Sequence, residues 1–345
     1  MTEISSSQRF LLAARELGTT RWASFTRVCC VPFLFDGIER VFASDRDPVT
    51  GIDELVDKLT NFLKAASDNG INHLGTTSER MMFDHPATEE ITGEHYGKLF
   101  NGFSEASFWD EPVALLRTRL SRNNIDISNL SDQEVLDAGC GGGRYTVAWK
   151  SLGAARAVGI DISSIGITNA RQRVIKAGVA GVNFQMGNVL DLPFPDNHFD
   201  IVFSNGVLHH TVDWEKGIAE MIRVLKPGGM GWLYLIENPG GLYWHVIELM
   251  RELMKDEDRE SARISLRMLG LPGNRIFYML DHVMAPINLR TTPNQVEQCL
   301  ASSGAAKVRR LERGADFDRI EKIYQGAPYA RLKYGVGENR YIFTK

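Results

Sequence analysis

A glycine-rich turn between an apolar run and a helical pattern constrains the fold of this chain most. Residues 135–144 have the sequence Val-Leu-Asp-Ala-Gly-Cys-Gly-Gly-Gly-Arg. Glycine adopts positive φ and lets a ligand approach the main chain, and the N-terminus of a following helix presents unpaired N–H groups. The pattern therefore predicts a strand, a tight turn and a helix that bind a nucleotide-like ligand.

Short apolar runs alternate with helical stretches beyond residue 131. This alternation predicts an α/β domain whose parallel sheet is covered by helices on both faces. A helical insertion rich in methionine and leucine follows the fifth run, at about residues 242–290. The expected strands are residues 134–139, 155–161, 182–187, 199–204 and 230–237, with two further candidates at 307–313 and 339–344.

The length of 345 residues corresponds to about two domains. We expect residues 1–95 to form a helical N-terminal domain with a fold that resembles a winged helix, used for dimerisation or as a cover. Residues 96–130 are expected to connect the domains and cover the site, and residues 131–345 to form the ligand-binding domain with its cap insertion. The apolar side chains in the N-terminal part predict either a homodimer contact or a buried core: Phe33, Leu34, Phe35 and Ile38.

Charge and composition exclude several classes of protein. Lysine and arginine number 39 against 43 acidic residues, a net charge of −4, so no basic field attracts nucleic acid or a membrane surface. The four cysteines lack the spacing of a disulfide scaffold or a zinc site, which favours a reducing compartment. No signal peptide pattern or long apolar run is present, so we expect a cytoplasmic protein.

The glycine spacing separates two nucleotide-binding patterns. A dinucleotide fingerprint that begins at Gly139 and Gly141 requires a third glycine at the position of Arg144, so binding of NAD is disfavoured. The sequence from Asp137 instead resembles motif I of the class I S-adenosylmethionine-dependent methyltransferases. Asp161 ends the second expected strand 24 residues later, a spacing at which a carboxylate accepts hydrogen bonds from both ribose hydroxyls.

Three more segments follow in the order found in that family. Residues 187–200 resemble its adenine loop, residues 204–210 its motif IV, and residues 223–229 the turn before its fifth strand. The resemblance implies a Rossmann-like sheet of seven strands with only the last strand reversed, and S-adenosylmethionine as the cofactor. In the family, the first acidic residue positions the methionine amino group and the second binds the ribose. The residues that would bind the cofactor are Asp137, Gly139, Cys140, Gly141, Asp161, Ile162, Asn188, Val189 and Asn205; the asparagine at 188 stands where the family usually has aspartate.

The methyl acceptor should lie beyond the carboxyl ends of strands four and five. His209 and His210 are expected there, and histidine is well suited to act as a base near neutral pH, although each has packing as its alternative role. The chain also resembles the α-keto acid C-methyltransferases, which methylate the β-carbon, and among them those that act on 2-ketoarginine in the biosynthesis of 3-methylarginine. That resemblance implies removal of a proton beside a carbonyl, assisted in some relatives by a divalent or ferric metal ion.

The resemblance to keto acid methyltransferases implies roles for five side chains. His209 is the favoured base, and His210 and His282 are the expected metal ligands, with exchangeable roles. Glu237 and Asp281 are candidates to bind a guanidinium tail, and each is otherwise an ordinary structural acid. Two other functions remain open: an O- or N-methyltransferase of a small metabolite that uses no metal, and a non-catalytic cofactor-binding protein. Motif IV lacks the Pro-Pro-Tyr pattern of nucleic-acid methyltransferases, so a small-molecule acceptor is expected.

Overall fold

The computed structural model describes residues 4–74 and 105–345. The chain forms two compact units, and we name each by its secondary structure. The helical unit comprises Met1–His85, Gly240–Met284 and Pro328–Tyr334. The sheet unit comprises Pro86–Pro239, Ala285–Ala327 and Gly335–Lys345. The boundary expected at residue 95 and the aromatic-rich residues 95–104 lie outside the described residues.

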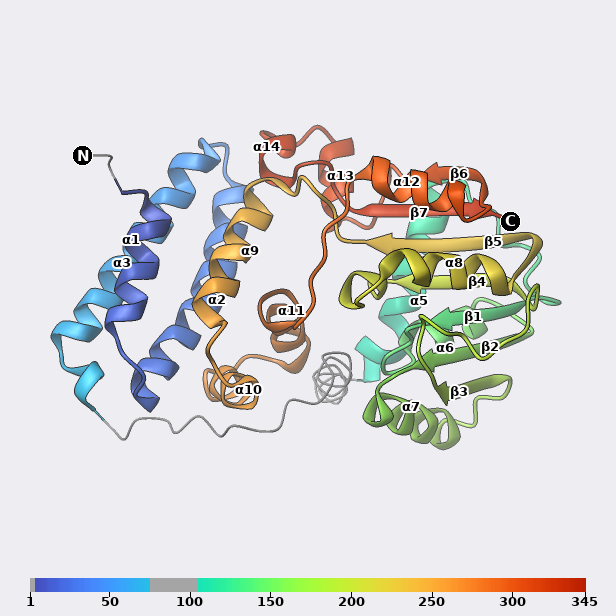
Figure 1. Cartoon of the computed structure of the whole chain (residues 1–345), viewed down its shortest axis with the longest axis horizontal. Coiled ribbons are helices and arrows are strands. Elements are labelled where there is room, and N and C mark those ends of the chain that lie inside the picture. Colours follow the sequence, from blue (N-terminus) through green and yellow to red (C-terminus); the bar gives the residue numbers. More distant parts are fainter. Residues whose placement is uncertain (1–3, 75–104) are drawn as a thin grey trace. The chain divides into compact units, whose positions relative to one another are not determined.

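The sheet unit contains a seven-stranded sheet with the order β3-β2-β1-β4-β5-β7-β6 (Figure 1). Strands β1 to β5 pair in parallel, and β7 runs antiparallel to both of its neighbours, β5 and β6. The predicted methyltransferase-type sheet with only its last strand reversed is therefore confirmed. The strands are β1 (Glu134–Ala138), β2 (Arg156–Asp161), β3 (Val182–Met186), β4 (Phe199–Asn205), β5 (Leu225–Leu235), β6 (Ala306–Arg310) and β7 (Asn339–Thr344).

Helices cover both faces of the sheet, as the buried and nearly continuous apolar strands require. On one face, apolar side chains of α5 (Glu105–Arg122), α6 (Arg144–Ser151) and α7 (Ser164–Lys176) pack against the strands. On the other face, α8 (Trp214–Val224) and α12 (Pro293–Ser302) pack against Leu233 and Leu235. Thr292 and Gln295 form a capping box at the start of α12.

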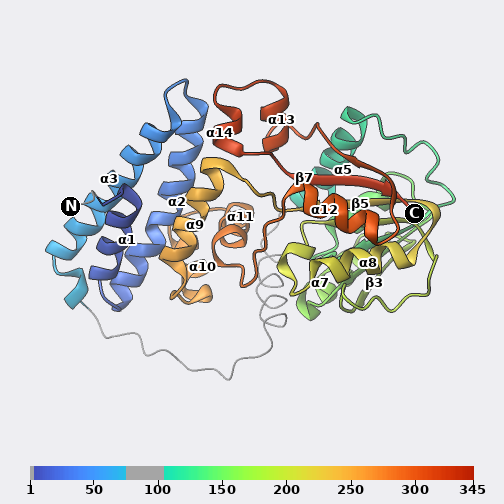
Figure 2. The same ribbon diagram turned by 45° about the horizontal axis from the view of Figure 1, so that its top comes forward.

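The helical unit is built from the N-terminal helices and from helices far along the chain (Figures 1 and 2). Leu34, Phe35 and Ile38 are buried in this unit, whereas the side chain of Phe33 is 54% exposed. A homodimer contact through this surface stays a prediction. Residues 4–74 contain helices and no strand, so this range holds no wing. The helices are α1 (Ser6–Glu16), α2 (Arg21–Ala43), α3 (Pro48–Asp68), η1 (Ile71–His73), α9 (Gly241–Met254), α10 (Arg259–Met268), α11 (Gly273–Met284) and α14 (Ala330–Tyr334).

The expected cap insertion folds as α9, α10 and α11, and these helices belong to the helical unit rather than to the sheet unit. The reason is the apolar surface of α9, where Trp244, Ile247 and Met250 are buried among the N-terminal helices. Within residues 4–74 and 105–345, no helix combines the length and the hydropathy needed to cross a membrane.

Candidate cofactor and acceptor site

The glycine-rich turn follows β1 and leads into α6. Gly139, Gly141 and Gly143 have φ values of 83°, 53° and 84°, a region that favours glycine. The backbone N–H groups of Gly139 and Cys140 both donate to the carbonyl oxygen of Ile160, at 2.8 and 2.9 Å. A Cβ on Gly139 would lie 2.2 Å from a methyl carbon of Val207. The absence of a side chain therefore lets the turn pack directly against the segment after β4.

Asp161 ends β2 beside this turn. Its Oδ2 atom accepts from the Gly141 N–H and its Oδ1 atom accepts from the Ser163 N–H, both at 2.8 Å. Burial raises the pKa of Asp161, and the N–H donors of Ser163 and Gly141 counter this effect only in part. The carboxylate is thus held in place at the carboxyl end of the sheet, next to the glycine-rich turn.

Asp137 lies on β1 and is almost completely buried, at 3% exposure. Its Oδ2 atom accepts from the hydroxyl of Thr146 at 2.7 Å. Burial raises the pKa of Asp137 to about 7, although the Thr146 hydrogen bond opposes this shift, and the nearby Asp161 raises it further. Asp137 is therefore a carboxyl group whose charge changes near neutral pH.

The predicted adenine loop packs on the end of β2. A Cβ on Gly187 would lie 2.4 Å from the Cδ1 atom of Ile160, so the loop approaches the sheet closely. The Oδ1 atom of Asn188 accepts from the Leu190 N–H at 2.9 Å, which uses the side chain to hold the loop. Val189 is buried in the core. Ile162, which follows Asp161 directly, is partly exposed.

The segment after β4 carries Asn205 and the short helix η2 (Leu208–His210). The Oδ1 atom of Asn205 accepts from the indole N–H of Trp232 at 3.3 Å. His209 and His210 are 3% and 7% exposed, and their ring centroids are 4.2 Å apart. The structure therefore places both predicted histidines at the carboxyl end of β4, on the segment that contacts the glycine turn.

Residues 287–289 form hydrogen bonds with His209 and His210, and the sequence analysis did not predict these bonds. The Leu289 N–H donates to the carbonyl oxygen of His209 at 2.9 Å. The Nδ1 atom of His210 lies 2.7 Å from the carbonyl oxygen of Ile287. Because a carbonyl only accepts hydrogen bonds, Nδ1 of His210 carries the proton in this contact.

His282 and Asp281 lie on α11 in the helical unit. The Nδ1 atom of His282 contacts the carbonyl oxygen of Tyr278 at 2.8 Å, and its ring stacks on Trp244 with centroids 5.6 Å apart. In the described part of the chain, no group of three or more His, Cys, Asp or Glu side chains is arranged to hold a metal ion. The predicted metal pair of His210 and His282 therefore gains no support from the structure.

Glu237, the predicted partner of a substrate guanidinium, lies beyond the end of β5 and is completely buried. Its carboxylate accepts two hydrogen bonds from the guanidinium of Arg319, at 2.8 and 3.2 Å. Arg319 thus makes the two hydrogen bonds to Glu237 that we expected the guanidinium of a substrate to make. Arg319 stands in the long connection between β6 and β7, where the sequence offered no periodic pattern to predict its position.

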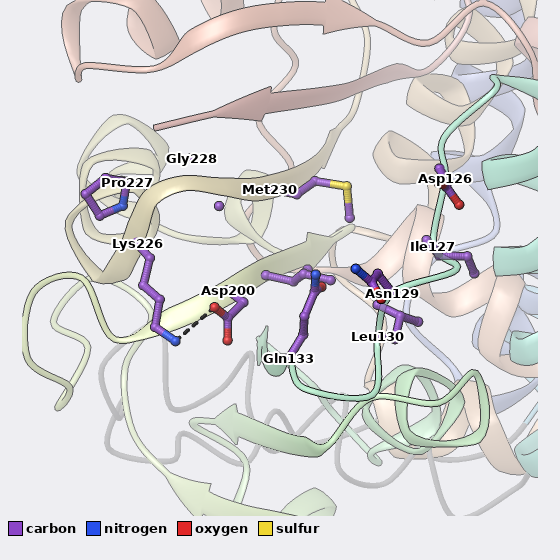
Figure 3. Close-up of a pocket in the computed structure, with 12 residues that line it drawn as sticks. Asp126, Ile127, Asn129, Leu130, Gln133, Asp200, Lys226, Pro227, Gly228 and Met230 are labelled. Carbon is purple, nitrogen blue, oxygen red and sulfur yellow. Dashed lines mark hydrogen bonds and ion pairs between the residues drawn. The ribbon is translucent and has the colours of Figure 1, made fainter.

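A cavity of about 280 Å³ lies at the opposite edge of the sheet, at the amino ends of β1, β4 and β5 (Figure 3). Asp200 and Lys226 form an ion pair across its wall at 2.9 Å. None of the residues predicted for the cofactor or acceptor site lines this cavity. Its lining includes Asp126, Asn129, Gln133, Pro227 and Met230.

The residues at the carboxyl edge suit S-adenosylmethionine. The carboxyl groups of Asp137 and Asp161 can accept from its amino and ribose groups, and a Cβ at residue 139 would clash with Val207. Comparison with protein families matches residues 136–233 to the family described as methyltransferase domain. Residues 136–233 are thus similar to a methyltransferase domain, and the strand order of the sheet is the one predicted from the resemblance to class I S-adenosylmethionine-dependent methyltransferases.

Curated relatives of the methyltransferase domain include a 27-O-demethylrifamycin SV methyltransferase of Amycolatopsis mediterranei, with 32% identity over 39% of this chain and 53% of that protein. An O-methyltransferase of Penicillium expansum is 29% identical over 42% of this chain and 57% of that protein. A sterol 24-C-methyltransferase of Gibberella zeae is 28% identical over 54% of this chain and 46% of that protein. The matching region thus spans about half of each relative.

A solved Haloferax volcanii complex of a methyltransferase and its Trm112 activator has a TM-score of 0.47 and 18% identity, over 74% of this chain and 96% of that chain.

Proposed function

We propose that this chain transfers the methyl group of S-adenosylmethionine to a small-molecule acceptor. The observation that carries the proposal is the Asp161 carboxylate, held by the N–H groups of Gly141 and Ser163 beside a turn that only glycine fits. In this proposal Asp161 binds the ribose, and Asp137 contributes to binding the methionine amino group. The matched methyltransferase domain supports the same assignment.

S-adenosylmethionine supplies an electrophilic methyl group, so the protein must orient a nucleophile, exclude water and remove a proton. His209 is the proposed base because it is buried at the carboxyl end of β4, on the segment that packs against the glycine turn. His210 would orient this base, since its own ring is fixed by the Ile287 carbonyl oxygen and lies 4.2 Å from the His209 ring.

The acceptor atom that we propose first is a hydroxyl oxygen. Two of the three relatives above are described as O-methyltransferases or act on an O-demethylated compound. Methylation of the β-carbon of an α-keto acid is the second candidate, favoured by the sequence resemblance and by a C-methyltransferase among the relatives. For 2-ketoarginine in particular, the pairing of Glu237 with Arg319 argues against the guanidinium site that we had expected.

A turnover assay tests the proposal. Purified protein is incubated with S-adenosylmethionine and a panel of phenols, amines, phenylpyruvate, 4-methyl-2-oxopentanoate and 2-ketoarginine, with and without a chelator, and products are identified by mass spectrometry. Methylation of a hydroxyl that is insensitive to the chelator is the expected result. Methylation of a keto acid at carbon would favour the second candidate. Failure to bind S-adenosylhomocysteine in calorimetry would overturn the proposed function.

A further inference from the structure

Tyr234 lies at the same edge of the sheet as the candidate base and was not predicted from the sequence. It is the penultimate residue of β5 and pairs with Asn205 on β4 and Arg340 on β7. Its ring centroid is 5.9 Å from that of His209, and a Cβ on Gly206 would lie 3.5 Å from its ring. Tyr234 therefore belongs to the group of side chains around the segment after β4.

A buried ionic bridge fixes the position of Tyr234. The guanidinium carbon of Arg340 lies 4.9 Å from the centroid of the Tyr234 ring, and Arg340 donates to Asp318 at 3.1 Å. Asp318 also accepts two hydrogen bonds of 2.8 Å from Arg119, which donates in turn to the Tyr145 hydroxyl at 3.1 Å. Tyr145 is in the first turn of α6, so the bridge connects the helix after the glycine turn with β5.

The bridge orients the Tyr234 ring more than it stabilises the fold. Its three charged side chains, those of Arg119, Asp318 and Arg340, are each at most 6% exposed. Burial would raise the pKa of Asp318, but Arg340 and Arg119 outweigh this effect and hold the pKa below its usual range. Removing such charges from water offsets most of their attraction, whereas their hydrogen-bond geometry allows few arrangements. The Tyr234 ring is thus held under Arg340 in one orientation.

The Tyr234 hydroxyl is a donor that the described residues leave for a ligand. No hydrogen bond to this hydroxyl occurs within residues 4–74 and 105–345, although Tyr234 is surrounded by charged groups. Burial raises the pKa of Tyr234, so the hydroxyl keeps its proton at physiological pH. A neutral hydroxyl that is fixed in place can donate to an oxygen of a bound molecule.

The charges around Tyr234 are paired with each other. Asp318 pairs with Arg340 and Arg119. Arg319 pairs with Glu237 at 2.8 Å and lies 3.7 Å from Glu338. The three arginines and three carboxylates of this cluster therefore leave no net charge for an ionic substituent of an acceptor. A charged group placed here would lose its hydration without gaining a counterion.

We propose that Tyr234 is an acceptor-binding residue and that the acceptor presents an uncharged hydroxylated aromatic ring, of the phenol class, to Tyr234 and His209. This inference rests on the proposed function and deepens it. The hydroxyl of Tyr234 donates to an oxygen on the acceptor ring, and the rings of Tyr234 and His209 supply apolar contact. His209 removes the proton of the oxygen that is methylated.

The test compares two tyrosine variants and two matched probes. Tyr234→Phe removes only the hydroxyl. Tyr341→Phe is the control, because the Tyr341 hydroxyl donates to Glu297 at 3.2 Å on the opposite face of the sheet. Methylation of catechol, which is uncharged, is compared with that of 3,4-dihydroxybenzoate, which carries a carboxylate. Rates are measured by mass spectrometry, and S-adenosylhomocysteine affinity by calorimetry.

We expect catechol to exceed 3,4-dihydroxybenzoate at least tenfold in kcat/KM. Tyr234→Phe should raise the KM for catechol about tenfold, the loss of one buried hydrogen bond, without changing S-adenosylhomocysteine affinity. Tyr341→Phe should change neither value.

Three results would overturn the inference: an unchanged KM in Tyr234→Phe, preference for the carboxylate probe, or cofactor binding without methylation of either phenol. Loss of the proposed function itself is distinguishable, because the wild-type protein would then bind no S-adenosylhomocysteine.

Discussion

The pKa values of aspartate side chains are shifted in opposite directions at the two edges of the sheet. At the carboxyl edge, burial raises the pKa of Asp137 and Asp161, and each carboxyl group accepts hydrogen bonds from neighbouring N–H or hydroxyl groups. At the amino edge, burial also acts on Asp200, but the Glu134 N–H and Lys226 outweigh it and lower the pKa. The desolvation cost of the carboxylate charge is therefore only partly compensated at the carboxyl edge. At the amino edge, the Glu134 N–H and Lys226 more than compensate it.

The cavity described above and the candidate site lie at opposite edges of the sheet. The cavity of about 280 Å³ lies at the amino edge, where the Asp200–Lys226 ion pair is already formed. The glycine turn, Asp137, Asp161 and the two histidines lie at the carboxyl edge, which is where ligands bind in open α/β sheets. The proposed functional edge is therefore chosen by its donors and acceptors and not by the size of a cavity.

The largest expected effect is that of Asp161→Ala. The variant loses two charge-assisted ribose contacts of about 1.5–3 kcal/mol each, so we expect S-adenosylhomocysteine affinity to fall about 10³-fold. Calorimetry measures the affinity, and the matched control at the opposite edge is Asp200→Ala, which should bind normally. Normal binding by Asp161→Ala would show that the cofactor site is misplaced.

His209→Gln should reduce kcat about 10²-fold or more, because a positioned base contributes at least this much to proton removal. Affinity for S-adenosylhomocysteine should stay within twofold, since His209 is not proposed to hold the cofactor. The measurement is the single-turnover rate with a compound of the acceptor panel that the wild-type protein methylates. His245→Gln, at an exposed position on α9, is the control. Equal rates in wild type and His209→Gln would assign the base to another residue.

Asp137→Asn should remove a pH dependence of stability. The folded-state pKa of about 7 is higher than the value of about 3.9 in an unfolded chain, so the native state retains its proton between these values. The contribution of Asp137 to the stability of the cofactor-free wild type should therefore be greatest below about pH 4 and fall as the pH rises to 7, by at most about 1.4 kcal/mol per unit.

Urea unfolding at pH 5, 6 and 7 measures this slope relative to Asp137→Asn. Asp200→Asn serves as the control, because the lowered pKa of Asp200 contributes no such fall over this range. A wild-type stability that runs parallel to that of Asp137→Asn would show that Asp137 is ionised throughout.

Lys226→Ala should have the smallest effect. Its partner Asp200 keeps the hydrogen bond from the Glu134 N–H at 2.9 Å, and a partly exposed ion pair contributes about 0–1 kcal/mol. We expect a change below about 1 kcal/mol in urea unfolding and no change in S-adenosylhomocysteine affinity. A tenfold loss of affinity would show that the two edges are coupled and would weaken the contrast drawn between them.

Local patterns predicted the sheet unit well and the surroundings of the site poorly. Five strands follow from apolar runs, because these signals act within a few residues. The histidines of η2 were predicted at the end of β4 for the same reason. The bond of His210 to Ile287 spans 77 residues, and no local pattern encodes such a contact.

The sequence by itself determined the order of the motifs, the strand succession and the positions of Asp137, Asp161 and His209, since glycine turns and apolar periodicity are properties of adjacent residues. Only the tertiary structure determined which charged side chains pair with each other. It paired Glu237 with Arg319, brought Arg340 over Tyr234, and packed α9 among the N-terminal helices. These contacts join residues far apart in the chain, so they depend on how whole elements pack and not on local sequence.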